Sequence, residues 1–431
     1  MTRSNQFRGF VRLPIAAIAI FLVIFATIPA QAQTLTVLHS FTGASDGASP
    51  GGSGLSMDRA GNLYGGTGYG GLQGSQCYAG QTCGTIFKLA RRSSGWTFDT
   101  LYSFHGPDGA TPDAPVVFGP DGTLYGTTFY GGTGCFNGCG NVFRLQPPPN
   151  FCASVSCPWT QTVLYQFTGG SDGSQPAFGA LSFDPAGNMY GTSTGNGNGS
   201  CGTVFELAHN GSQWTFNLVW TFTDHLDGCS SWSGVTFDQA GNLYGTTTRG
   251  GTDQAGTAFE LTPYGQGWSL LPLHQFVLAS DGSESFGNLI FGQTGNLLGT
   301  NRSYGPGQAG VVFELSPSSG GWNFSVLHSF DFTDQEGPQA PLLMDASGNL
   351  YGTSVEGGQY GWGLIFKMTS TGSGYTYTDL YDFTGGSDGG WPYGQIVMDA
   401  NGNLYGTTEE GGIRNEFCGS YGCGVVWELT P

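Results

Sequence analysis

Gly241-Asn242-Leu243-Tyr244-Gly245-Thr246-Thr247 is one of seven copies of a short segment that recurs along the whole chain. The copies begin at Gly61, Gly122, Gly187, Gly241, Gly295, Gly348 and Gly402. Six of them have tyrosine followed by glycine, and in the fifth copy Leu298 replaces the tyrosine. A short apolar run bounded by glycine and asparagine is typical of a β-strand. The sequence therefore predicts seven repeats of one strand-containing unit.

Three further strand-like segments accompany this one in every repeat. Around the first copy they are residues 35–41, a short segment ending at Asp58, and residues 84–89. The chain beyond residue 33 shows no helical periodicity, so an all-β fold is expected. Four strands in each of seven repeats predict seven four-stranded antiparallel sheets. Seven such sheets close into a seven-bladed β-propeller.

The order of the segments also predicts how the ring closes. Residues 35–41 correspond to the fourth strand of a blade, whereas residues 425–429, at the other end of the chain, correspond to a third strand. We therefore expect the N-terminal strand to complete the last blade, which leaves neither sheet edge exposed. Repeated aspartates such as Asp238 are expected to begin hairpin turns. Glycines such as Gly245 are expected to let adjacent blades approach closely.

Residues 1–32 have the features of a secretory signal peptide. Arg3, Arg8 and Arg12 precede an apolar run that ends before the small-residue pattern Ala30-Gln31-Ala32. The alternative is an uncleaved membrane anchor, although the run is shorter than the ~20 residues that a spanning helix needs. We expect residues 33–431 to form one propeller domain. We also expect the mature protein to be secreted or periplasmic, monomeric and not inserted in a membrane.

Acidic residues and glycine dominate the composition. The chain has 30 acidic and 12 basic residues, a formal net charge of −18, and three of the arginines precede residue 33. Nucleic acids and anionic membranes bind basic surfaces, so neither is expected as a partner. Glycine accounts for 77 of the 431 residues, far above the usual ~7 %, and fits short strands joined by tight turns.

The repeat pattern resembles a known family. The segments Gly241–Thr247, Gly250-Gly251 and Gly202-Thr203-Val204-Phe205-Glu206-Leu207 are similar to the GloVer-type tandem repeat of bacterial extracellular proteins. The resemblance covers the chain from Thr34 to Pro431. It implies an exported location and adds no catalytic residues. Members often carry a C-terminal sorting anchor, which is not expected here because the chain ends at its last strand.

Insertions in three repeats predict a raised sector on one face of the ring. From the tyrosine of the second strand (or Leu298) to the aromatic residue of the third, the seven spans are 23, 18, 15, 15, 15, 15 and 22 residues. The long loops, residues 66–84, 129–140 and 409–424, belong to blades 1, 2 and 7, which are neighbours in a closed ring. The ten cysteines are expected to form five disulfides: Cys77–Cys83, Cys135–Cys139, Cys152–Cys157, Cys201–Cys229 and Cys418–Cys423. Structural zinc is the alternative, but its ligands would converge, whereas these pairs are scattered.

One aspartate recurs in the loop that leads from each blade to the next. The seven positions are Asp46, Asp108, Asp172, Asp227, Asp281, Asp334 and Asp388. A ring of carboxylates could attract calcium. Because each loop offers a single aspartate, we favour the interpretation that each one accepts backbone hydrogen bonds within its own turn. No metal and no other cofactor is expected, with calcium as the alternative.

The candidate ligand-binding residues are aromatic side chains in and around the raised sector: Tyr69, Tyr130, Trp391, Phe417 and Tyr421. We favour a non-enzymatic binding module that recognises a glycan or an extracellular protein, because disulfide-braced loops lose less entropy on binding. A carbohydrate-active hydrolase or lyase is the alternative. Its acid and base would come from the carboxyl cluster Glu409, Glu410 and Glu416. A structural envelope protein without a ligand is the third alternative.

Overall fold

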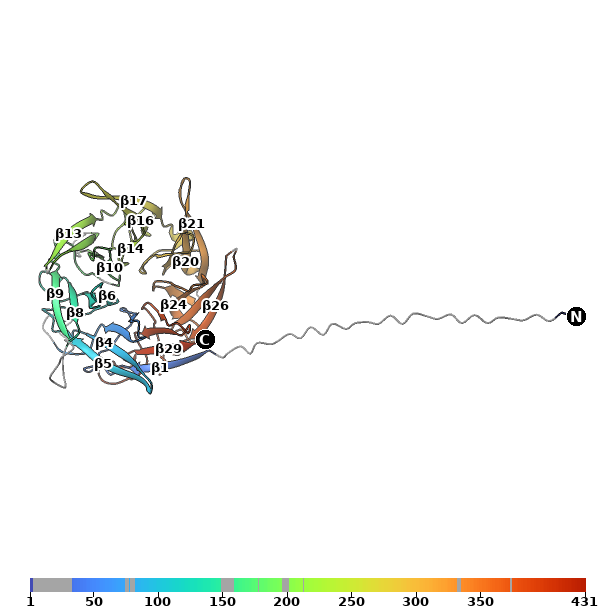
Figure 1. Cartoon of the computed structure of the whole chain (residues 1–431), viewed down its shortest axis with the longest axis horizontal. Helices are drawn as coiled ribbons and strands as arrows, with labels where there is room; N and C mark the ends of the chain where they lie inside the picture. The colour runs from blue at the N-terminus through green and yellow to red at the C-terminus, as the bar shows by residue number, and fades with distance from the viewer. Residues whose placement is uncertain are drawn as a thin grey trace. The chain divides into compact units, whose positions relative to one another are not determined.

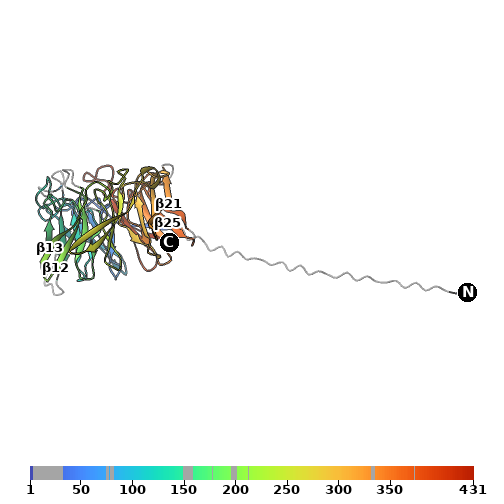
Figure 2. The ribbon, with the colours of Figure 1, turned by 90° about the horizontal axis from the view of Figure 1, so that it is seen from above.

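The computed structural model describes residues 1–2, 33–73, 77, 82–148, 159–176, 178–195, 201–211, 213–331, 335–372 and 374–431. The compact unit Gln33–Pro431 holds seven antiparallel sheets arranged around a ring (Figure 1). Loops project from both ends of the sheets, as the perpendicular view in Figure 2 shows. The predicted seven-bladed β-propeller is confirmed.

The strands repeat in a fixed order from the ring axis outward. The innermost strands are short: β2 (Leu55–Met57), β6 (Val117–Phe118), β10 (Ser182–Phe183), β14 (Thr236–Phe237), β18 (Ile290–Phe291), β23 (Leu343–Met344) and β27 (Val397–Met398). The second strands are β3 (Leu63–Thr67), β7 (Leu124–Thr128), β11 (Met189–Ser193), β15 (Leu243–Thr246), β19 (Leu297–Asn301), β24 (Leu350–Gly357) and β28 (Leu404–Thr408). The third strands are β4 (Thr85–Arg92), β8 (Asn141–Gln146), β12 (Thr203–Asn210), β16 (Thr257–Tyr264), β20 (Gln308–Ser318), β25 (Leu364–Ser370) and β29 (Val425–Thr430).

The outermost strands complete the blades. They are β5 (Gly95–Ser103), β9 (Thr160–Gln166), β13 (Gln213–Thr221), β17 (Gly267–Gln275), β21 (Gly321–Asp331), β26 (Tyr375–Asp382) and β1 (Thr34–Ser40). Two elements lie outside this order. The strand β22 (Gln335–Pro338) pairs with β24, and the single helical turn α1 (Leu278–Asp281) lies in the connection from blade 4 to blade 5.

The N-terminal strand closes the ring, as the segment order predicts. Strand β1 pairs antiparallel with β29, with Thr34 opposite Thr430 and Val37 opposite Trp427. Figure 1 shows the two strands side by side. The edges of β1 and β29, which would otherwise be open at the two ends of the chain, are therefore hydrogen-bonded to each other.

The second strands form the buried layer of the ring. In β15 every residue is buried, and Gly245 lies directly opposite Phe259 of β16. A Cβ atom on Gly245 would lie 2.6 Å from Cζ of Phe259. The glycine therefore makes room for an aromatic ring of its own blade. The expectation that it lets adjacent blades approach is wrong, because the close contact runs across one strand pair within the sheet.

Contact between blades is made instead by pairs of aromatic rings. A phenylalanine at the end of each outermost strand, such as Phe276, is buried against the aromatic residue of the next blade's third strand, such as Phe313. The ring centroids of the seven pairs are 5.2 to 5.9 Å apart. The repeated tyrosine adds to this contact, since Tyr244 packs against Phe291 and Trp322 of the next blade.

The repeated aspartates between the first two strands form turns, as predicted. The backbone N–H of Gly241 donates to the carbonyl of Asp238, and the carboxylate of Asp238 accepts N–H bonds from Ala240 and Asn242. The hydroxyl of Tyr244 also donates to this carboxylate, at 3.3 Å. These hydrogen bonds lower the pKa of Asp238, although burial alone would raise it.

We predict that Gly245→Ala destabilises the propeller, because the new methyl group must displace the ring of Phe259. Overpacking of this kind costs about 1–3 kcal/mol, and urea unfolding followed by tryptophan fluorescence would measure it. The matched control is Gly267→Ala in the same blade, where a Cβ atom would meet nothing within 4 Å. Adding Phe259→Leu to Gly245→Ala should restore part of the loss. Equal stability of the two glycine variants would contradict this account.

Candidate functional site

Most insertions and disulfides lie on one face of the ring, which carries the loops between second and third strands and the connections between blades. We call it the loop face. Disulfides join Cys77 to Cys83, Cys135 to Cys139, Cys201 to Cys229, and Cys418 to Cys423, which confirms four of the predicted pairs. The fifth expected pair, Cys152–Cys157, lies outside the described residues. Disulfides persist in oxidising compartments, so the four bridges indicate an exported protein.

A cavity of about 620 Å³ on the loop face brings together six of the predicted site residues. We call it the peripheral groove. It lies between blades 7 and 1 and is lined by Tyr69, Glu409, Glu410, Glu416, Phe417 and Tyr421. Phe417 and Tyr421 are 59 % and 58 % exposed; Phe417 directly precedes Cys418, and Tyr421 lies within the loop that the Cys418–Cys423 bridge closes. The amide of Asn415 donates to the carbonyl of Thr42, which fixes this loop on the neighbouring connection.

The other two predicted aromatic residues lie elsewhere. Tyr130 is half-buried in blade 2, where its ring is edge-on to Phe129 with centroids 4.5 Å apart. Trp391 is half-buried beside Trp362 of blade 6, with centroids 6.1 Å apart. The five aromatic residues therefore do not form one platform. Sequence reasoning also missed Phe136, which is 93 % exposed between Cys135 and Cys139.

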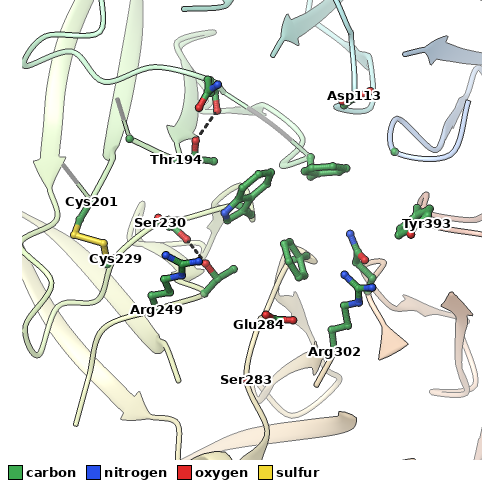
Figure 3. A pocket seen from close by; sticks show the side chains of 18 of the residues that line it. Asp113, Thr194, Cys201, Cys229, Ser230, Arg249, Ser283, Glu284, Arg302 and Tyr393 are labelled. Carbon is green, nitrogen blue, oxygen red and sulfur yellow. Dashed lines mark hydrogen bonds between the residues drawn. A yellow bond between two sulfur atoms is a disulfide. The ribbon is translucent and has the colours of Figure 1, made fainter. Parts of the chain in front are cut away.

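A larger cavity of about 1100 Å³ lies on the ring axis at the loop face (Figure 3). We call it the central cavity. An equivalent residue of each connection between blades has a left-handed backbone. The seven residues, with φ between 54° and 76°, are Ser49, Thr111, Gln175, Ser230, Glu284, Gly337 and Trp391. A sevenfold repeat of this conformation indicates a structural role: the N–H of Ser49, for example, donates to the preceding blade and its carbonyl accepts from its own.

Side chains at the next turn of these connections converge on the axis. Phe178, Trp232 and Phe286 form an aromatic cluster, with Trp232 5.3 Å from Phe178 and 5.8 Å from Phe286 between centroids. Gly52 occupies the corresponding position in blade 1, where a Cβ atom would lie 2.9 Å from Phe178. The ring of Phe178 therefore occupies the space that the missing side chain of Gly52 leaves.

Carboxyl groups of blades 2 and 7 meet over the small residues of blade 1. A Cβ atom on Gly51 would lie 2.6 Å from Cβ of Glu409, and one on Gly52 would lie 3.4 Å from Cβ of Asp113. The hydroxyl of Ser49 donates to Glu409 at 3.0 Å. Glu409 lines both the central cavity and the peripheral groove, so the two cavities adjoin at this side chain.

Burial changes the protonation of these carboxyl groups. Burial and the adjacent Glu409 raise the pKa of Asp113 to about 8. Burial also raises the pKa of Glu409, although the hydrogen bond from Ser49 opposes it. For Glu410, burial and then Glu409 raise the pKa to about 7 against the opposing charge of Arg414. Such groups donate as well as accept hydrogen bonds near neutral pH.

Two arginines lie on the other wall of the central cavity, and sequence reasoning missed them. Arg302 directly follows strand β19 as Glu409 follows β28, and Arg249 occupies the same repeat position as Glu410 and Tyr69. The repeat alignment alone could have identified both, because these positions vary while the strand before them does not.

The repeated aspartates of the connections have local partners in the described residues. Asp172 accepts from the hydroxyl of Tyr165 at 3.0 Å and from the backbone N–H of Thr168 at 2.7 Å. Asp46, Asp108, Asp227, Asp281 and Asp388 likewise accept from an aromatic side chain of the preceding strand and from a nearby backbone N–H. Asp334 lies outside the described residues. These bonds support the local interpretation, and calcium binding stays an untested alternative.

Among the described residues, one group has the spacing of a metal site: Cys201, Asp224 and Cys229. Its two sulfur atoms form a disulfide, so they are not available as thiolate ligands. The described part of the chain also holds no helix that is long and apolar enough to span a membrane.

We predict that Asp113→Asn reduces the loss of stability that the protein undergoes as the pH rises. The folded-state pKa of Asp113 is about 8 against an ordinary value of 3.8, so the folded state retains the proton more tightly than the unfolded state. This contribution is fully present below pH 3.8 and is lost as the pH rises through 8. Because one pKa unit corresponds to about 1.4 kcal/mol, the variant should lose several kcal/mol less stability than wild type between pH 5 and pH 9.

Thermal unfolding from pH 5 to pH 9 measures this difference. The control is Asp253→Asn, which removes an exposed carboxylate from the rim of the same cavity. Parallel pH profiles for wild type and Asp113→Asn would show that Asp113 ionises normally.

Solved structures share the fold at low sequence identity. The extracellular domain of a candidate one-component system from B. thetaiotaomicron is 11 % identical, with a TM-score of 0.52, over 92 % of this chain and 40 % of that one. This chain thus spans less than half of that structure. A candidate 6-phosphogluconolactonase from Bacteroides uniformis is 14 % identical, with a TM-score of 0.48, over 75 % and 82 %. A gluconolactonase from Xanthomonas campestris is 13 % identical, with a TM-score of 0.37, over 72 % and 90 %.

At these identities the first likeness shows the fold alone, and the other two carry no further argument. No curated protein matches the chain. A family model does match it three times, over residues 23–160, 153–331 and 286–431, under the description Gloeobacter/Verrucomicrobia repeat. These matches cover all seven blades, including the repeated segment Gly241–Thr247. The chain therefore belongs to the Gloeobacter/Verrucomicrobia repeat family.

Proposed function

We propose that the protein is a secreted or periplasmic, monomeric binding module that recognises a glycan in the peripheral groove. The observation that carries the proposal is the shared lining of that groove by Tyr69, Phe417 and Tyr421 and by three carboxyl groups. Aromatic faces pack against the C–H faces of sugars, and carboxyl groups bond to sugar hydroxyls. Both contacts tolerate water at the rim of a binding site.

Preorganisation supports a binding role for these residues. The Cys418–Cys423 bridge closes a six-residue segment that holds Phe417 beside the connection of blade 1. Asn415 accepts the N–H groups of Phe417 and Cys418 on its side-chain oxygen, and so fixes the turn from within. A loop that is ordered before binding loses less conformational entropy when the ligand arrives.

A hydrolase acting in the same groove is the second candidate, and the carboxyl pKa values favour it. Glu410 has a pKa of about 7 and lies next to Glu409, so one carboxyl group could donate a proton while another accepts one. Glycoside hydrolysis needs such a pair. The same cavity serves both candidates, so the decision rests on whether product is released.

We predict that Phe417→Ala and Tyr421→Ala each weaken glycan binding about tenfold, the loss expected when an aromatic contact of about 1–2 kcal/mol is removed. A glycan and polysaccharide array identifies the ligand, and calorimetry then measures the affinities. The matched control is Tyr264→Ala, which removes a 77 % exposed tyrosine from the hairpin between β16 and β17, outside both cavities. Unchanged binding by both groove variants would place the binding site elsewhere.

We predict no product release from the bound glycan, since the favoured function is binding without turnover. The same array, read by chromatography of the released sugars, tests this. Turnover that disappears in Glu409→Gln/Glu410→Gln would establish the hydrolase instead. Binding to extracellular proteins in place of any glycan would reject the ligand class while keeping the binding role.

A further inference from the structure

The central cavity combines features that the peripheral groove lacks. It has two arginines on the wall of blades 4 and 5, together with Asp224, Asp253 and Glu284, and Asp113 and Glu409 on the wall of blades 2 and 7. The aromatic cluster of Phe178, Trp232 and Phe286 also lines it. The described residues that line the groove, in contrast, include three carboxyl groups and no basic side chain. The two cavities share Ser49, Tyr69 and Glu409, so one extended ligand could occupy both.

The basic wall is unusual for this protein. The chain has 12 lysines and arginines against 30 acidic residues, yet Arg249 and Arg302 both line this one cavity. They come from the corresponding loops of adjacent blades 4 and 5. In Figure 3 their side chains lie on either side of Glu284, and Asp113 lies apart from them across the pocket.

The charges on this wall leave the arginines available to a ligand. Glu284 accepts from the hydroxyl of Ser303 at 2.8 Å, and no ion pair within 4.0 Å joins it to either arginine in the described chain. Arg302 is 3.9 Å from Glu356, a half-exposed contact of the kind that contributes little in water. Arg249 forms no hydrogen bond or ion pair through its guanidinium group with any described residue.

We propose that the central cavity binds a carboxylated sugar, with Arg249 and Arg302 holding the carboxylate and the aromatic cluster packing against the sugar ring. The proposal rests on the proposed function, because it names the acidic unit of the glycan whose neighbouring units would lie in the groove. Arginine suits this task because its planar guanidinium presents paired donors to a carboxylate.

The opposite wall fits the remaining groups of such a sugar. Asp113 and Glu409 retain protons at higher pH than ordinary carboxyl groups, so they add less negative charge there than their number implies. Protonated, they can donate to ring hydroxyls as well as accept from them. The carboxylate of the ligand meets both arginines when it points towards blades 4 and 5, and only carboxyl groups when it points towards Asp113 and Glu409.

The test uses glucuronate and its neutral counterpart glucose, titrated against the full-length mature protein by ligand-observed NMR. We expect glucuronate to bind at least about tenfold more tightly than glucose, and Arg249→Gln/Arg302→Gln to remove that advantage. The control Arg59→Gln/Arg92→Gln removes two exposed arginines that lie outside both cavities and changes the net charge equally. It should leave the affinity for glucuronate within about twofold.

A second variant tests the position of the carboxylate. Glu284→Gln removes the negative charge between the arginines and should tighten glucuronate binding severalfold without changing the affinity for glucose. Equal affinity for the two sugars, or a glucuronate affinity that survives loss of both arginines, would overturn the proposal. So would unchanged or weaker glucuronate binding by Glu284→Gln.

The outcomes separate this proposal from the proposed function. Arginine-dependent glucuronate binding without any glycan bound at Phe417 and Tyr421 would keep the central site and reject the groove. Glycan binding that depends on Phe417 and Tyr421 but shows no preference for acidic units would keep the groove and reject the central site.

Discussion

The buried contact between an aromatic ring of one blade and an aromatic ring of the next is the interaction on which the ring depends. A four-stranded sheet this narrow cannot bury its own faces, so each blade needs both neighbours. The pair formed by Phe383 and Trp427 shows how closely the parts are matched. Trp427 is the largest of the third-strand aromatics, and the glycine opposite it, Gly406, gives the ring its space. A substitution at any such position therefore disturbs the packing of two blades.

Positions with the same residue in every repeat serve the packing of the blades. The chemical differences between blades are therefore found at structurally equivalent positions whose residue type changes from blade to blade. The residue that follows the second strand is glycine in blade 1, phenylalanine in blade 2, arginine in blade 5 and glutamate in blade 7. The backbone places the glycine, arginine and glutamate at the wall of the same central cavity. The family scaffold can therefore change its ligand through a few side chains without changing its core.

The sequence was sufficient for the features that depend on local spacing or on repetition. Strand number, ring closure, the turn formed by Asp238 and the short-range disulfides all follow from residues that are close in the chain or recur in every unit. Convergence at the axis does not, because it depends on how loops of different blades meet. Asp113 and Glu409 are far apart in sequence and meet only through the glycines of blade 1. Tyr130 has the same repeat position as Tyr69, and Trp391 the same position as Ser49, yet Tyr130 packs against Phe129 and Trp391 against Trp362 of the preceding blade.

The pairing of β1 with β29 has a consequence for how the protein forms. Every other blade is built from consecutive segments, but blade 7 needs a strand from the beginning of the chain and three from its end. The entropy lost in bringing Thr34 to Thr430 is recovered only when the last blade assembles. Until then β1 is an unpaired strand and β29 an open edge, each able to pair with another molecule. In an exported chain that emerges N-terminus first, β1 must therefore avoid pairing with other molecules until β29 has emerged and formed.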